Sequence, residues 1–144
     1  MCHLLILLAA ILAPQAAFPQ ASADVSAGTD TCITAIAESC PINYKDGWII
    51  NAVTNSADTV RLELQVPSSL AGFLSMLTGE GDNVKLLWLR QLSCFGDPWE
   101  RLCGCVVAAR RALVIDVRPK DSKVDAEIVL SPEDLERLTA SIKD

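Results

Sequence analysis

Residues 48–66 read "WIINAVTNSADTVRLELQV", and this stretch decides the class of fold. In its second half Val60, Leu62, Leu64 and Val66 alternate with polar residues, which is the period of a β-strand with one wet face. The "NSAD" between the two halves consists of residues that favour turns. The stretch therefore predicts a β-hairpin with one apolar side.

A second hairpin is predicted in "ALVIDVRPKDSKVDAEIVL", residues 112–130. Here Val124, Ala126, Ile128 and Leu130 are spaced two apart, so they share one side of a strand. The intervening "PKDSK" supplies the turn. We expect the two hairpins to bury their apolar sides in one core.

The two hairpins also correspond at a constant offset, 64 residues from Val53 to Val117. The same offset relates Glu63 to Glu127, and each hairpin is followed by a Ser/Pro helix start. An internal ββα duplication would explain this correspondence. The alternative is that any two amphipathic hairpins followed by helices look alike under a period of two.

Helices are predicted before, between and after the hairpins. The expected segments are residues 31–39 ended by Pro41, about 70–77, 84–92, 98 to about 108, and a last helix capped by Ser131, Pro132, Glu133 and Asp134. The fourth of these tolerates Gly104 at a cost of about 1 kcal/mol relative to alanine. This order predicts an α+β fold, a four-stranded antiparallel sheet built from two hairpins with the helices packed on one face.

The beginning of the chain has the pattern of an export signal. Residues 4–13 are an apolar run, and the small residues at 21–23, "ASA", are typical of a cleavage site. The run is about half of the ~20 residues that a membrane-spanning helix needs. We therefore expect removal of residues 1–23, a flexible N-terminus at 24–30, and one α+β domain at 31–144, located in the periplasm or outside the cell.

Charge and histidine content restrict the function. The net charge of −6 weighs against nucleic acid or an anionic membrane as a partner. The only histidine, His3, lies in the expected leader. A processed chain without imidazole could form no Ser-His-Asp triad, no Cys–His nucleophile pair and no histidine-ligated metal site. We expect no enzymatic activity, no cofactor, no bound metal and no transmembrane span in the processed chain.

Five of the six cysteines follow the leader: Cys32, Cys40, Cys94, Cys103 and Cys105. In an oxidising compartment they are candidates for disulfides, with Cys94 to Cys103 or Cys105 as the bridge closest in sequence. Cys32 and Cys40 would lie about 12 Å apart on one helix, so each would need another partner. The odd number would leave one thiol free or join two chains in a dimer.

The pair Cys103 and Cys105 has several interpretations. A structural disulfide is favoured by compartment and spacing. A redox site would need a thiolate of low pKa, for which Arg101 is the nearest cation. A zinc site is disfavoured because structural zinc prefers Cys-x2-Cys spacing. The last alternative is a set of buried thiols that act as small apolar residues.

Trp48, Trp88, Trp99, Arg110 and Arg111 are candidate contacts to a partner. Tryptophan often anchors interfaces. Core packing accounts for the tryptophans equally well in a chain with few aromatic residues. Cations at a helix C-terminus offset its dipole, which accounts for the arginines.

The segment "IAESCPINYKDGWIINAVTNSADTVRLELQVP", residues 36–67, resembles the opening of small exported α+β proteins of uncharacterised function from Bacteroidota. The Cys40-Pro41 junction and the order of elements carry this resemblance. It implies a periplasmic or secreted domain, and it brings no catalytic motif with it.

These observations predict a secreted or periplasmic non-enzymatic domain that binds a protein or envelope ligand. The alternatives are a thiol–disulfide redox protein that uses Cys103 and Cys105, and a disulfide-linked structural or oligomeric envelope protein.

Overall fold

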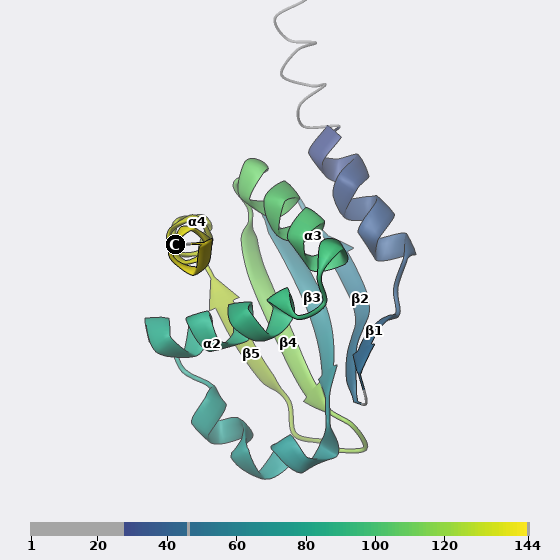
Figure 1. Cartoon of the computed structure of the whole chain (residues 1–144), viewed down its shortest axis with the longest axis vertical. Helices are drawn as coiled ribbons and strands as arrows, with labels where there is room; N and C mark the ends of the chain where they lie inside the picture. The colour runs from purple at the N-terminus through teal and green to yellow at the C-terminus, as the bar shows by residue number, and fades with distance from the viewer. Residues whose placement is uncertain (1–27, 46, 144) are drawn as a thin grey trace, which may run out of the picture.

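The computed structural model describes residues 28–45 and 47–143. The expected leader and residues 24–27 of the expected N-terminus lie outside these ranges. Residues 28–38 are helical and form the described part of an N-terminal helix, which includes residues before the expected start at Thr31. The described residues form an α+β fold in which α2, α3 and α4 lie in front of a sheet (Figure 1).

After the N-terminal helix the elements are β1, Ile42–Lys45; β2, Trp48–Asn55; β3, Thr59–Val66; the 3-10 helix η1, Ser68–Leu77; α2, Asp82–Ser93; α3, Asp97–Ala108; β4, Ala112–Pro119; β5, Ala126–Leu130; and α4, Pro132–Lys143. Each expected helix and both expected hairpins lie within a few residues of their predicted positions. The segment expected at about 70–77 is helical, with 3-10 geometry throughout.

The expected four-stranded antiparallel sheet is wrong, because the sheet has five strands and is mixed, in the order β1-β2-β3-β4-β5. The two hairpins β2–β3 and β4–β5 are antiparallel, but they join through β3 and β4, which run parallel from Thr59 opposite Ala112 to Val66 opposite Pro119. Parallel neighbours need a crossover connection, which η1, α2 and α3 supply. The fifth strand, β1, has only four residues, in which Ile42 and Tyr44 alternate with Asn43 and Lys45, and so short a run was not predicted to be a strand.

The expected duplication of a ββα unit stays a prediction. The offset of 64 residues does hold for element starts, since β2 begins at Trp48 and β4 at Ala112. However, β4 is parallel to β3 and therefore antiparallel to β2, its supposed equivalent. The two hairpins are thus not related by a simple shift along the sheet, which would make these strands parallel. The period-two pattern also accounts for the similarity.

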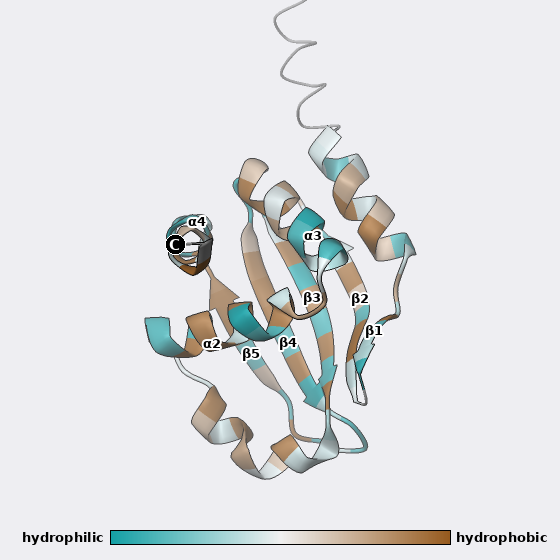
Figure 2. Cartoon of the chain, in the orientation of Figure 1, coloured by the Kyte–Doolittle hydropathy of each residue, from teal (hydrophilic) through white to brown (hydrophobic). Residues whose placement is uncertain are grey.

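The core lies between the sheet and the helices. The strands contribute alternate apolar residues, because successive side chains of a strand point to opposite faces. Figure 2 shows the apolar residues distributed over strands and helices. The fully buried members include Ile50, Leu62, Leu64, Leu113, Ile115 and Ile128 from the strands and Ile33, Leu74, Trp88, Leu92, Leu102 and Leu135 from the helical segments. Val124, expected on this apolar side, lies before β5 and is exposed.

The opposite side of the sheet is polar. Arg61 of β3 pairs with Glu127 of β5 at 3.1 Å and lies 3.8 Å from Asp116 of β4. Arg118 also binds Asp116, at 3.0 Å. These pairs give the buried carboxylate of Asp116 two cationic neighbours.

The core assignment predicts unequal effects of two alanine substitutions in neighbouring strands. Ile115→Ala should lower the free energy of unfolding by about 2–5 kcal/mol, because it leaves a cavity beneath the helices. The control is Val129→Ala on the polar side, where the side chain is 49% exposed and the change should stay within about 0.5 kcal/mol. Urea unfolding followed by circular dichroism measures both, and equal losses would contradict the assignment.

Candidate functional site

A pocket of about 450 Å³ lies between α3 and α4, next to the end of α2. Helix α3 contributes Trp99, Glu100, Cys103, Gly104, Val107 and Ala108, while Ser93 comes from α2 and Thr139 and Ile142 come from α4. The α3 residues form two adjacent rows with a spacing of four, so the helix presents one continuous stripe to the pocket. The lining is mainly apolar, with few polar groups.

Gly104 opens this pocket. It lies in the interior of α3, where glycine costs about 1 kcal/mol relative to alanine. A Cβ atom added at Gly104 would meet no atom within 4 Å, so close packing does not require glycine there. The absence of a side chain instead leaves space above the helix empty, and this space belongs to the pocket.

The hydroxyl groups that line the pocket already donate hydrogen bonds to carbonyl oxygens of their own helices. Ser93 donates its hydroxyl hydrogen bond to the carbonyl oxygen of Arg90, and Thr139 donates to the carbonyl oxygen of Leu135 at 2.6 Å. In this arrangement their oxygens offer free lone pairs to a ligand. Glu100 is the single charged residue among the described residues of the lining, and an ionised carboxylate also only accepts.

Trp99 has an unused donor. The residue is 4% exposed, yet its indole N–H makes no hydrogen bond within the described ranges. No fully buried side-chain nitrogen or oxygen of the described residues lacks a partner, so this N–H reaches solvent-accessible space. Trp99 is the only one of the three tryptophans that lines this pocket.

An ionic network holds the pocket wall formed by α4 against α2. Lys85 of α2 donates to Asp134 of α4 at 2.8 Å, and Arg137 binds both Asp82 at 2.8 Å and Asp134 at 3.1 Å. The hydrogen bond from Lys85 is the main cause that lowers the pKa of Asp134 to about 2. The backbone N–H of Asp134 donates to the hydroxyl of Ser131, which confirms the expected helix cap.

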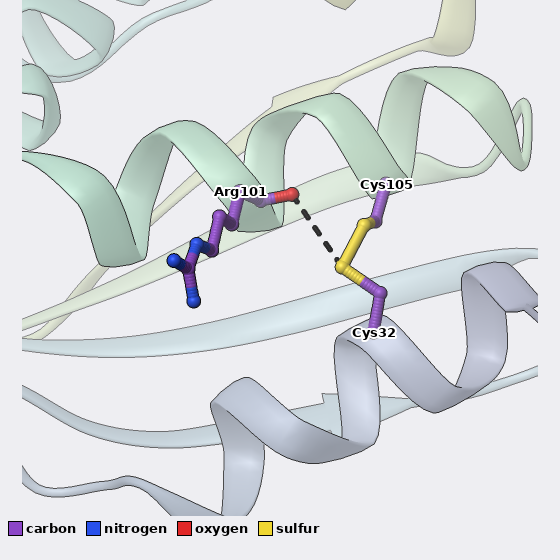
Figure 3. The surroundings of a disulfide bond; sticks show 3 residues. All are labelled: Cys32, Arg101 and Cys105. Atoms are coloured by element: carbon purple, nitrogen blue, oxygen red, sulfur yellow. Dashed lines mark hydrogen bonds between the residues drawn. A yellow bond between two sulfur atoms is a disulfide. The ribbon is translucent and has the colours of Figure 1, made fainter.

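A disulfide joins Cys32 of the N-terminal helix to Cys105 of α3, with a Cα–Cα distance of 6.4 Å (Figure 3). The expected disulfide is therefore present, but the expected pairing of Cys94 with Cys103 or Cys105 is wrong. Residues two apart on a helix do not share a face, so Cys105 meets the N-terminal helix while Cys103 lines the pocket. The sulfur of Cys32 also lies 3.7 Å from the carbonyl oxygen of Arg101, a contact without a proton because this sulfur is bonded.

The remaining described cysteines are thiols in three different places. Cys40 is half-buried, donates to the carbonyl oxygen of Ile36, and has its pKa raised by burial. Cys94 is exposed at the end of α2. Cys103 is half-buried in the pocket. A dimer through an odd cysteine stays a prediction, because the whole chain has six and the count depends on the leader.

Arg111 is a structural cation. Its guanidinium binds the carboxylate of Asp30 at 2.6 Å and the side-chain oxygen of Asn55, which ties the N-terminal helix to β2 and to the end of α3. Hydrogen bonds from Asn55 and Arg111 lower the pKa of Asp30. Arg110 is exposed in the turn after α3, with a positive φ of 55°. Of the two arginines expected to contact a partner, only Arg110 is exposed.

The other tryptophans serve the core. Trp88 is fully buried, and its indole N–H donates to the carbonyl oxygen of Leu77 at 2.6 Å. Trp48 is half-buried beside Trp88 at a smaller cavity of about 150 Å³. The main pocket thus brings together Trp99 and Cys103 from the expected residues. Sequence reasoning missed Glu100, Thr139 and Ile142 as lining residues, and only the interior glycine at 104 signalled the site.

Within residues 28–45 and 47–143, no group of three or more His, Cys, Asp or Glu side chains is placed to hold a metal ion. In the same part of the chain no helix has the length and apolar character needed to cross a membrane.

The disulfide gives a stability prediction. Replacing both Cys32 and Cys105 by serine should lower the free energy of unfolding by about 4 kcal/mol, because the bond closes a long loop in the unfolded chain. The bonded cysteines are 73 residues apart. The control Cys94→Ser, at an exposed thiol, should change stability by less than about 0.5 kcal/mol. Urea unfolding of the oxidised proteins measures both, and a double variant as stable as the wild type would contradict the role of the bond.

The network at α4 gives a pH prediction. Because the pKa of Asp134 falls from its ordinary 3.8 to about 2 on folding, its ionised form contributes stability above pH 4. This contribution is lost as the pH falls from about 4 to 2. Asp134→Asn should therefore destabilise the protein at pH 6, and the difference from wild type should shrink at pH 2.5. Ser141→Ala, an exposed position of α4, should leave the pH dependence of urea unfolding unchanged.

Comparison of the chain with protein-family models, with curated proteins and with solved structures found no match. The resemblance to exported Bacteroidota proteins therefore stays a prediction. Inference of function rests on the pocket between α3 and α4 and on the residues that line it.

Proposed function

We propose that this chain is an exported, non-enzymatic binding domain whose ligand occupies the pocket between α3 and α4. The observation that carries this proposal is Gly104. Position 104 lies in the interior of α3 and has room for a side chain, but glycine has none. The empty space widens the pocket. The glycine lowers helix stability by about 1 kcal/mol, a cost that a binding role would explain.

The size and lining of the pocket support small-molecule binding. Its volume of about 450 Å³ lies within the roughly 300–1,000 Å³ that is typical of ligand sites. Such sites combine an apolar lining with a few polar groups that orient the ligand. The apolar lining includes Trp99, Val107 and Ile142. The polar groups that could orient a ligand belong to Glu100, Ser93 and Thr139.

Two features support export. The first 23 residues have the apolar run and small-residue site of a cleaved leader. The Cys32–Cys105 bond is the kind of link that persists in an oxidising compartment. Removal of the leader would take away His3, the only imidazole of the chain. Glu100 and Cys103 would then be the titratable groups of the pocket, without a histidine to activate the thiol.

The two alternatives rest on the remaining thiols. A redox protein that uses Cys103 and Cys105 would require exchange between them, whereas Cys105 is bonded to Cys32 and lies on another side of α3. A disulfide-linked envelope protein would use Cys94, whose thiol is exposed. The geometry favours the binding domain over both.

Binding in the pocket should depend on position 104. A neutral apolar fluorophore, N-phenyl-1-naphthylamine, should bind the processed wild-type protein with a rise in fluorescence. Gly104→Leu should abolish this binding, because its side chain fills the pocket without a backbone clash. Gly104→Ala should retain binding and raise the free energy of unfolding by about 0.5–1 kcal/mol.

The matched control adds a leucine side chain away from the pocket. Ala140→Leu lies on the exposed side of α4 and should leave fluorophore binding unchanged. If Gly104→Leu binds the fluorophore as tightly as the wild type does, the pocket is not the ligand site.

A further inference from the structure

We infer that the ligand of the α3–α4 pocket is a small amine, with an ammonium group that carries N–H donors, an adjacent hydrogen-bond acceptor and an apolar body. This inference rests on the proposed function, since it names the chemical class that the same pocket would bind. It follows from the chemistry of the polar groups that line the pocket.

The charge of the pocket selects a cation. Glu100 is the only charged residue of the described lining, and it carries a carboxylate. The whole chain has a net charge of −6, so its long-range field also attracts cations and repels anions. An anionic ligand would bring its own charge next to Glu100, and the described residues of the lining include no cation to offset it.

The hydrogen-bonding groups select a donor. The hydroxyl protons of Ser93 and Thr139 are engaged with carbonyl oxygens of their own helices. While these bonds are kept, both oxygens and the carboxylate of Glu100 offer lone pairs to a ligand. A primary ammonium has three N–H donors, whereas a quaternary ammonium has none. The lining thus favours an ammonium group with N–H donors over a quaternary ammonium.

The indole N–H of Trp99 favours a ligand with one hydrogen-bond acceptor near its ammonium group. This N–H is an unpaired donor, although Trp99 as a whole is 96% buried. The N–H reaches solvent-accessible space, and Trp99 lines the pocket. A carbonyl or hydroxyl oxygen near the ammonium would accept this hydrogen bond. Without such an oxygen, binding would take the N–H away from water and leave it unsatisfied.

The rest of the lining accepts the apolar body. Val107, Ala108 and Ile142 surround the space that Gly104 leaves empty. L-Leucinamide has the three required parts, namely an ammonium, an adjacent amide oxygen and an isobutyl group. It is therefore the probe that tests the inference.

Two matched probes separate the contributions. N-acetyl-L-leucinamide keeps the isobutyl group and an amide oxygen but lacks the ammonium, while 3-methylbutylamine keeps the ammonium and lacks the amide. Isothermal titration at low salt should show the tightest binding for L-leucinamide. Glu100→Gln should weaken its binding about two- to fivefold, the range for an exposed ion pair, and leave N-acetyl-L-leucinamide unaffected. Trp99→Phe should remove the advantage of L-leucinamide over 3-methylbutylamine.

A second readout locates the probe. Cys103 lines the pocket and Cys94 lies outside it. L-Leucinamide should slow the alkylation of Cys103 by iodoacetamide and leave the rate at Cys94 unchanged, with the sites assigned by peptide mass spectrometry. Gly104→Leu should abolish both the heat of binding and the protection.

The outcomes separate this inference from the proposed function. If N-acetyl-L-leucinamide binds as tightly as L-leucinamide, and Gly104→Leu abolishes both, the pocket binds ligands but does not select amines. If L-leucinamide binds without protecting Cys103, its site is elsewhere and the inference is wrong. If neither the three probes nor the neutral fluorophore bind, the proposed function fails as well.

Discussion

The parallel pairing of β3 with β4 is the constraint on which the rest of the fold depends. A hairpin cannot connect parallel neighbours, so the chain between Val66 and Ala112 must leave one end of the sheet and return to the other. This crossover contains η1, α2 and α3, and its apolar residues, such as Trp88 and Leu102, cover the apolar side of the strands. The opposite side keeps Asp116 balanced by two arginines, and the sheet needs no second helical layer there.

The pocket is a consequence of where the crossover meets the last helix. Helix α3 ends the crossover directly before β4, and α4 follows β5, the strand on the other side of β4 from β3. The two helices therefore contact each other although they come from different parts of the chain. Lys85 and Asp134 hold α4 to α2, so the gap beside α3 keeps its shape. Gly104 leaves that gap open where another residue would narrow it.

The N-terminal helix is joined to this framework by a covalent and an ionic link. The Cys32–Cys105 bond holds it to α3, and Arg111 connects Asp30 with Asn55 at the end of β2. The bond occupies one side of α3 while the pocket occupies another, so the same helix serves stability and the proposed binding site independently. Cys103 and Cys105 are neighbours in the sequence with different surroundings for this reason.

The sequence by itself determined the local elements. Alternation in Val60–Val66 predicted a strand, and Ser131 with Asp134 predicted a helix start, because both patterns depend only on nearby residues. The direction of β4, the strand β1, the partner of Cys105 and the pocket at Gly104 were decided by the tertiary structure alone. A period of two tells which side of a strand is apolar, but backbone hydrogen bonds are nearly the same for every strand and do not encode its neighbour. Cys32 and Cys105 meet across 73 residues only because the crossover has already placed α3 beside the N-terminal helix.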